Sequence, residues 1–288
     1  MLFSLALIPV IVLLVLIYFK DKNEKEPIWF LLILFFAGMG SIIPAFIVEA
    51  IGEWIVTLFL SWIPVMKAYI IATMIVGPIE ELGKYAVLVL ITWRSKQFNY
   101  SFDAIVYAVF VSLGFAALEN VAYVLGDGWG TGIIRMFTAV PGHACFAVFM
   151  GALYSRAKYA QITKNKRDLV LFMVLALVVP ATTHGVYDAV VMGAAESENY
   201  LFLGLSLLYW VGFVLAMFAV AFGVVIWASK KDFCFLPTPE NGWIHYRPAV
   251  AGNWNCMCGK INQLNFCPNC GRMRPMPNNG NVVNRNVM

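Results

Sequence analysis

Residues 200–229 read YLFLGLSLLYWVGFVLAMFAVAFGVVIWAS and contain no charged side chain. A helix needs about 20 apolar residues to cross the roughly 30 Å hydrocarbon core of a bilayer, so this stretch predicts a membrane span. Similar stretches precede it at 2–19, 28–50, 68–92, 103–125, 133–158 and 169–192. We therefore expect an all-α polytopic membrane protein, a bundle of about seven transmembrane helices. The short stretch 54–66, interrupted by Pro64, predicts an interfacial or re-entrant helix, with an eighth span as the alternative.

The composition of the 288-residue chain supports a membrane protein. Apolar residues make up 61% and charged residues only 12%, whereas soluble domains carry about 25% charged residues. The mean hydropathy is +0.77 and the net charge is +4. So little polar material excludes a cytosolic globule, a disordered chain and a protein that binds nucleic acid electrostatically. The lipid bilayer is the expected environment, and no nucleic-acid partner is expected.

The distribution of Lys and Arg predicts the orientation. They gather in alternate loops, at 20–25, 94–96 and 156–167, and again after residue 229. Cytoplasmic loops carry such an excess of positive charge. With seven spans, the N-terminus lies outside the cell membrane and the C-terminus lies in the cytoplasm.

Several ionisable residues lie inside the predicted spans, where a charged group at the helix centre costs about 2.5–3.5 kcal/mol on insertion scales. Glu80 and Lys84 are four residues apart, as are His184 and Asp188, so each pair shares one helix face. At about 1.5 Å per residue, the polar positions of four spans fall at similar heights between the midplane and the outer interface. Pro78, Pro141 and Pro180 each precede one of these polar residues by a few positions. A proline frees a backbone carbonyl of a membrane helix, which is tolerated where protein or water satisfies it, so the three prolines suggest a hydrated cavity. We expect one buried constellation around a hydrated cavity, made of Glu80, Glu81, Glu119, His143, His184 and Asp188.

Two kinds of chemistry use such a constellation. In hydrolysis, a glutamate acts as the general base for a water, and the histidines bind a divalent metal or stabilise the oxyanion. In a proton- or cation-coupled transporter, the same residues form a relay; the chain lacks the internal repeat that transporters usually show. A third possibility is a membrane scaffold in which each polar pair is purely structural. Cys145 lies on a different helix face from His143, which favours an apolar packing role over a Cys–His dyad.

Four motif blocks together resemble the PrsW family of intramembrane proteases, which is itself similar to the CAAX prenyl protease and bacteriocin-processing group. The resemblance covers about residues 1–229. The blocks are Glu80-Glu81-x-x-Lys84, Gly114-Phe115-x-x-x-Glu119-Asn120, Pro141-Gly142-His143 and His184-x-x-x-Asp188.

The resemblance implies an intramembrane endopeptidase that cleaves a membrane-anchored protein, for example a regulator such as an anti-sigma factor. It implies that Glu80 and Glu81 activate the water, with Glu80 as the base. His143 and His184 would bind a metal or stabilise the oxyanion. Asp188 would orient His184, Glu119 would complete the site, and Lys84 would balance charge.

The residues after 229 differ sharply from the rest. We expect a transmembrane protease-like domain at 1–229, a linker at 230–250, a zinc ribbon at 251–275 and a disordered tail at 276–288. Two close cysteine pairs, with eight residues between them, match a structural zinc site with four thiolate ligands. A cytoplasmic protein partner could bind this ribbon. The expected ligands are Cys256, Cys258, Cys267 and Cys270.

Overall fold

The computed structural model describes residues 2–236, 244–246, 254–255 and 261–262. The chain divides into two compact units, Met1–Tyr246 and Arg247–Met288. In the second unit, strand β3 (Trp254–Asn255) pairs antiparallel with β4 (Ile261–Asn262). The four cysteines of the expected zinc ribbon, and the expected disordered tail, lie outside the described residues.

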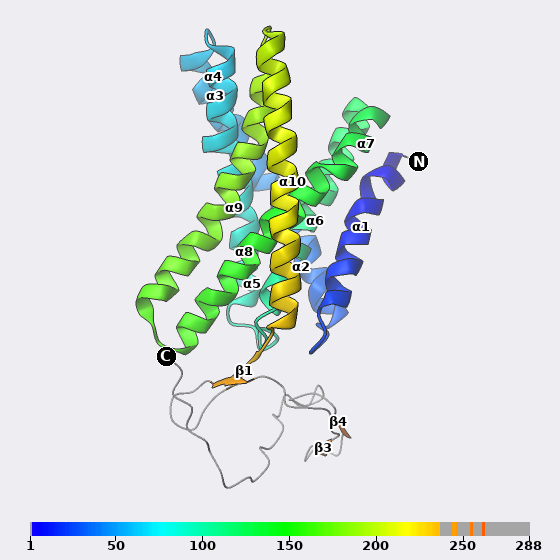
Figure 1. Cartoon of the computed structure of the whole chain (residues 1–288), viewed down its shortest axis with the longest axis vertical. Coiled ribbons are helices and arrows are strands. Elements are labelled where there is room, and N and C mark those ends of the chain that lie inside the picture. Colours follow the sequence, from blue (N-terminus) through cyan, green and yellow to red (C-terminus); the bar gives the residue numbers. More distant parts are fainter. Residues whose placement is uncertain (1, 237–243, 247–253, 256–260, 263–288) are drawn as a thin grey trace. The chain divides into compact units, whose positions relative to one another are not determined.

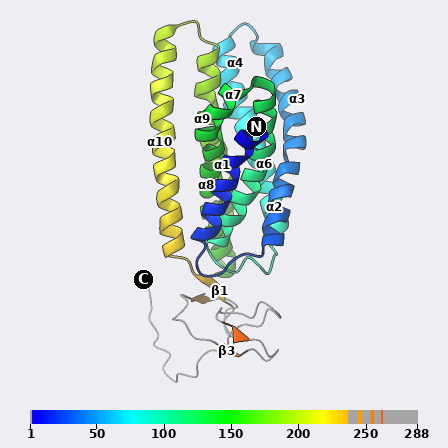
Figure 2. The same ribbon diagram turned by 90° about the vertical axis from the view of Figure 1, so that its right-hand side faces the viewer.

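The first unit is a helical bundle (Figure 1; a second view is in Figure 2) that ends in a short hairpin. The hairpin pairs β1 (Cys234–Leu236) with β2 (Ile244–Tyr246). The helices are α1 (Leu2–Lys20), α2 (Ile28–Gly40), α3 (Ile42–Leu60), α4 (Pro64–Ile70), the π-helical segment η1 (Ile71–Val76), α5 (Gly77–Thr92), α6 (Asp103–Asp127), α7 (Trp129–Phe137), α8 (Ala139–Ile162), α9 (Lys166–Ala195) and α10 (Tyr200–Lys230).

The polytopic all-α fold is confirmed. Within the described residues, six helical segments are long and apolar enough to cross a bilayer. The remaining expected span, 68–92, is helical but is interrupted by η1 and carries two glutamates and a lysine. The six segments are Phe3–Lys20, Ile28–Leu60, Asp103–Asp127, Trp129–Ile162, Lys166–Ala195 and Tyr200–Lys230.

Two local expectations differ from the structure. Residues 54–60 complete α3 and do not form a separate interfacial helix, because the next helix break comes where Pro64 begins α4. Pro78 and Pro141 lie in the first turns of α5 and α8, where a missing backbone N–H costs little, whereas Pro180 lies inside α9.

Helix α6 is the core of the bundle, and every residue from Asp103 to Ala117 is buried. Glycines let neighbouring helices approach it closely, as small residues do between membrane helices. A Cβ atom added to Gly114 would lie 2.0 Å from the backbone oxygen of Phe35 on α2. One added to Gly77 of α5 would lie 2.5 Å from the backbone nitrogen of Gly185 on α9. The second contact places the start of α5 directly against the middle of α9.

Buried carboxylates gather at the end of the bundle where α1 and α10 end and α6 begins. Asp232 accepts hydrogen bonds from Asn23 Nδ2 and Ser101 Oγ, at 2.7 and 2.8 Å. Glu24 accepts one from Asn99 Nδ2 at 3.1 Å. Burial raises the pKa of Glu24 to about 8, against a smaller opposing effect of the Asn99 bond. Burial therefore favours the protonated form of Glu24 at this end of the bundle.

Candidate active site

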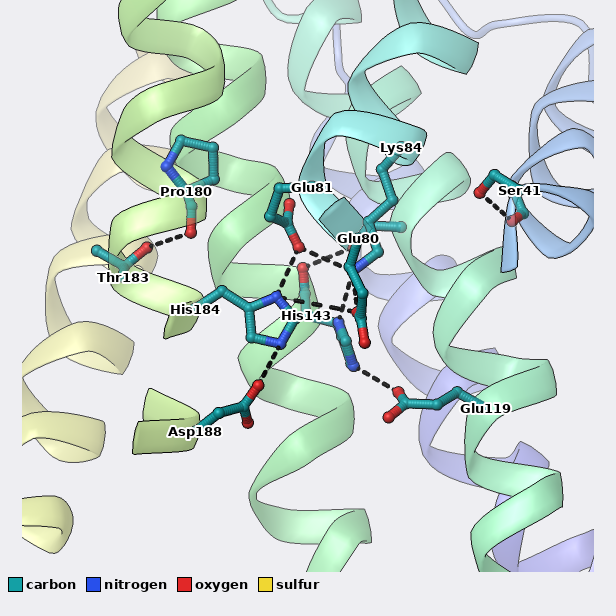
Figure 3. A network of polar contacts seen from close by, with 12 residues as sticks. Ser41, Glu80, Glu81, Lys84, Glu119, His143, Pro180, Thr183, His184 and Asp188 are labelled. Carbon is teal, nitrogen blue, oxygen red and sulfur yellow. Dashed lines mark hydrogen bonds and ion pairs between the residues drawn. The ribbon is translucent and has the colours of Figure 1, made fainter. Parts of the chain in front are cut away.

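The start of α5 carries three charged side chains that are in contact. Lys84 Nζ donates to Glu80 Oε2 at 2.9 Å and to Glu81 Oε1 at 2.8 Å (Figure 3). The spacings of four and three residues place both carboxylates on the same helix face as the lysine. All three residues are buried, so this group is a desolvated ion cluster inside the bundle.

His143 of α8 contacts this ion cluster from a different helix. Lys84 Nζ lies 3.1 Å from His143 Nδ1, and His143 Nε2 lies 2.8 Å from Glu119 Oε2 on α6. An ammonium group can only donate, so Nδ1 accepts, and the ring proton sits on Nε2 and is donated to Glu119. The two neighbours thereby fix one neutral tautomer of His143.

His184 of α9 reaches the cluster from the other side. Its Nδ1 lies 3.0 Å from Glu81 Oε1 and its Nε2 lies 3.2 Å from Asp188 Oδ2. Both ring nitrogens therefore lie within hydrogen-bond distance of a carboxylate oxygen. The Phe146 ring stacks on the imidazole with a centroid distance of 4.5 Å. His184 is thus held in one orientation from three sides.

The network encloses one side of a cavity of about 1110 Å³. Glu80 is on the cavity wall, as are His143 and His184, whereas Glu81 and Lys84 are not part of the lining. Glu80 therefore faces the space that a water and a substrate would occupy, and Glu81 lies behind it. The six residues that the sequence singles out all belong to this connected network (Figure 3).

The cavity wall also carries charged residues that are absent from the sequence-based set, and two of them, Arg135 and Glu49, bear on the site. Arg135 of α7 lies 3.0 Å from Glu119 Oε2 through Nη2, and its Nε donates to Asn120 Oδ1 at 2.9 Å. Glu49 of α3 lines the cavity, and its Oε1 is buried without a hydrogen-bond partner among the described residues. The sequence could have pointed to Glu49, because it is an acidic residue inside an otherwise apolar stretch. Nothing in the sequence indicated the contact between Arg135 and Glu119.

The donor atoms of Glu80, Glu81, His143 and His184 lie within 4.8 Å of one another and could in composition hold a metal ion. Carboxylates and imidazoles are ordinary zinc ligands. In this arrangement, however, Lys84 Nζ is within hydrogen-bond distance of three of the four residues. Both ring nitrogens of each histidine also lie close to another polar group. The chemical composition of the site fits a metal, but the hydrogen bonding as it stands does not.

The sequence matches the family described as PrsW family intramembrane metalloprotease over residues 26–224. The chain belongs to the PrsW family. Protease PrsW of Geobacillus kaustophilus is 32% identical over 211 residues, which cover 73% of this chain and 88% of that protein. Protease PrsW of Bacillus subtilis is 29% identical over 217 residues, covering 73% and 91%. No solved structure matches the chain.

Membership in this family makes the protein a multi-pass membrane hydrolase. The matched residues 26–224 include every member of the network in Figure 3, from Glu80 to Asp188. The cysteines after residue 255 fall outside the match. The family match therefore lies within the first unit.

Proposed function

We propose that this PrsW family protein is an endopeptidase that hydrolyses a peptide bond of a membrane-anchored protein, with Glu80 as the base that activates the water. The observation that carries the proposal is the position of Glu80, which is hydrogen bonded into the charged network and also faces the cavity. A membrane-anchored regulator such as an anti-sigma factor is the substrate class that we propose.

The residues allow a balanced reaction. Glu80 accepts a proton from water, and the water oxygen attacks the peptide carbonyl carbon. The positive charge of His184 stabilises the oxyanion that forms. Glu80 then gives its proton to the nitrogen as the carbon–nitrogen bond breaks, so the products are a carboxylic acid and an amine, and Glu80 is again a carboxylate.

The other residues keep these groups in place. Asp188 orients His184 through Nε2, and Glu81 holds its Nδ1. His143 faces the cavity with its tautomer fixed by Lys84 and Glu119. Positioned groups of this kind reduce the reorganisation that the reaction would otherwise require.

We further propose that the N-terminus lies outside and the C-terminus lies in the cytoplasm. The C-terminal ends of α1, α5, α8 and α10 lie at one end of the first unit (Figure 1), and Lys20, Arg94, Lys158 and Lys230 lie in or just after these ends. Basic residues mark the cytoplasmic side. Asp127, the last residue of α6, lines the cavity at the opposite end, so the cavity would open toward the outer face.

Purified protein in proteoliposomes with a single-pass substrate tests the function. We expect the wild type to produce two fragments and His184→Ala to lose at least about 100-fold in rate. Glu198→Gln, on an exposed loop residue, is the control and should retain full activity. A pH-dependent ion flux without fragments would support the transporter alternative and contradict the proposal.

A further inference from the structure

Lys84 Nζ lies among donor atoms of the same residues that could hold a metal ion. It is 2.9 Å from Glu80 Oε2, 2.8 Å from Glu81 Oε1 and 3.1 Å from His143 Nδ1. We propose that the Lys84 ammonium group is the resident cation of this site and takes the place of a metal, so that lysine and metal are alternative occupants of one donor set. The inference concerns what this site binds and stands whether or not the hydrolysis proposed above is correct.

Each N–H of the Lys84 ammonium group has an acceptor nearby. It has three N–H donors, and three acceptors from two helices surround it. The Phe115 ring lies 4.2 Å from Nζ, and the residue is 0% exposed. Lys84 is therefore not a flexible surface lysine that happens to be close; its head group is coordinated on every donor.

The lone pairs of the two histidines are not available to a metal in this arrangement. A neutral imidazole has one lone pair, and that of His143 accepts from Lys84 at Nδ1 while Nε2–H faces Glu119. Each ring nitrogen of His184 lies within hydrogen-bond distance of a carboxylate oxygen. A metal ligand must offer a lone pair, so a metal could enter only if Lys84 left and His184 gave up one of these contacts.

Basic side chains of the protein already pair with the acids of this site. The carboxylates of Glu80, Glu81, Glu119 and Asp188 each have a basic partner among Lys84, His184 and Arg135. Removing a buried cation from its partners is strongly destabilising, because it leaves uncompensated charge. A metal that displaced Lys84 would break all three of its contacts.

Cobalt binding to full-length variants tests the proposal. We expect wild type and His143→Ala to bind the same number of Co²⁺ equivalents per chain, since the site of the wild type holds lysine. Lys84→Met removes the ammonium at similar length and should gain one equivalent. Lys84→Met/His143→Ala should lose that equivalent again. Because all comparisons use the whole chain, an ion held by the C-terminal cysteines contributes equally to every variant.

The absorption spectrum identifies the donors of the added cobalt ion. It should lack thiolate charge-transfer bands, because the donors are oxygen and nitrogen. Loss of one equivalent from wild type on His143→Ala would overturn the proposal, and that comparison decides even if Lys84→Met fails to fold. A folded Lys84→Met that gains no cobalt would overturn it as well.

Discussion

Arg135 should control the rate of cleavage although it is remote from the proposed base. Its guanidinium pairs with the same oxygen of Glu119, Oε2, that accepts from His143. Removing the charge in Arg135→Gln leaves Glu119 to attract the His143 proton alone, and the tautomer of His143 is then held less firmly. Arg135 acts through Glu119 and is a positioning residue.

The size of the effect follows from the contacts. The contact of Arg135 with Glu119 is an ion pair; exposed ion pairs contribute about 0.2–1 kcal/mol, and breaking a buried one costs about 3–5 kcal/mol. The side chains of Arg135 and Glu119 are 14% and 17% exposed, which favours a value between these limits. If about 1.4–2.8 kcal/mol is lost in the transition state, kcat falls about 10- to 100-fold. Arg135→Lys keeps the charge and should recover part of the loss.

A double-mutant cycle in proteoliposomes separates this role from a general structural one. If Arg135 acts through Glu119, then Arg135→Gln/Glu119→Gln should be no slower than Glu119→Gln alone. The KM for substrate should change less than kcat. Additive losses in the double variant, or full activity in Arg135→Gln, would refute the reasoning.

Three other predictions concern packing, charge and orientation. Gly77→Ala should lower the thermal unfolding temperature and reduce activity, because its Cβ would meet the backbone of α9, whereas Gly204→Ala, which meets nothing within 4 Å, should change neither. The raised pKa of Glu24 means that the folded protein binds more protons than the unfolded chain between about pH 4.5 and 8, so stability falls as the pH rises through that window. Glu24→Gln keeps an acceptor for Asn99 and should unfold at a temperature that falls less between pH 5 and 8, as measured in detergent; an unchanged slope would contradict the assignment. Asp188→Asn keeps an acceptor for His184 Nε2 and should retain much of the cleavage rate, whereas Asp188→Ala should lose about 10- to 100-fold; equal losses would argue against an orienting role.

The part of the site that follows from helix periodicity was predictable. Glu80 with Lys84, and His184 with Asp188, are pairs four residues apart that the structure brings into contact. The common height of the polar residues also predicted that different helices would meet, since antiparallel spans of known length fix depth along the membrane normal. Depth and helix face are properties that a single sequence encodes locally.

Contacts that depend on how helices are rotated and spaced were not predictable. The pairing of Arg135 with Glu119 depends on the turn at Gly128, whose φ of 81° lets α7 follow α6 directly. The third contact of Lys84, with His143 at 3.1 Å, depends on how α5 and α8 both pack against α6 and α9. Neither relation has a periodic signature in the sequence.

The most direct test of the proposed mechanism is the single-turnover cleavage rate of Glu80→Gln in proteoliposomes, beside the wild type and Glu198→Gln. We expect the Glu80 variant to bind the single-pass substrate and to cleave it at least about 100-fold more slowly, because general-base catalysis contributes about 10²–10⁴-fold. Cleavage by Glu80→Gln at the wild-type rate would contradict the assignment of Glu80 as the base.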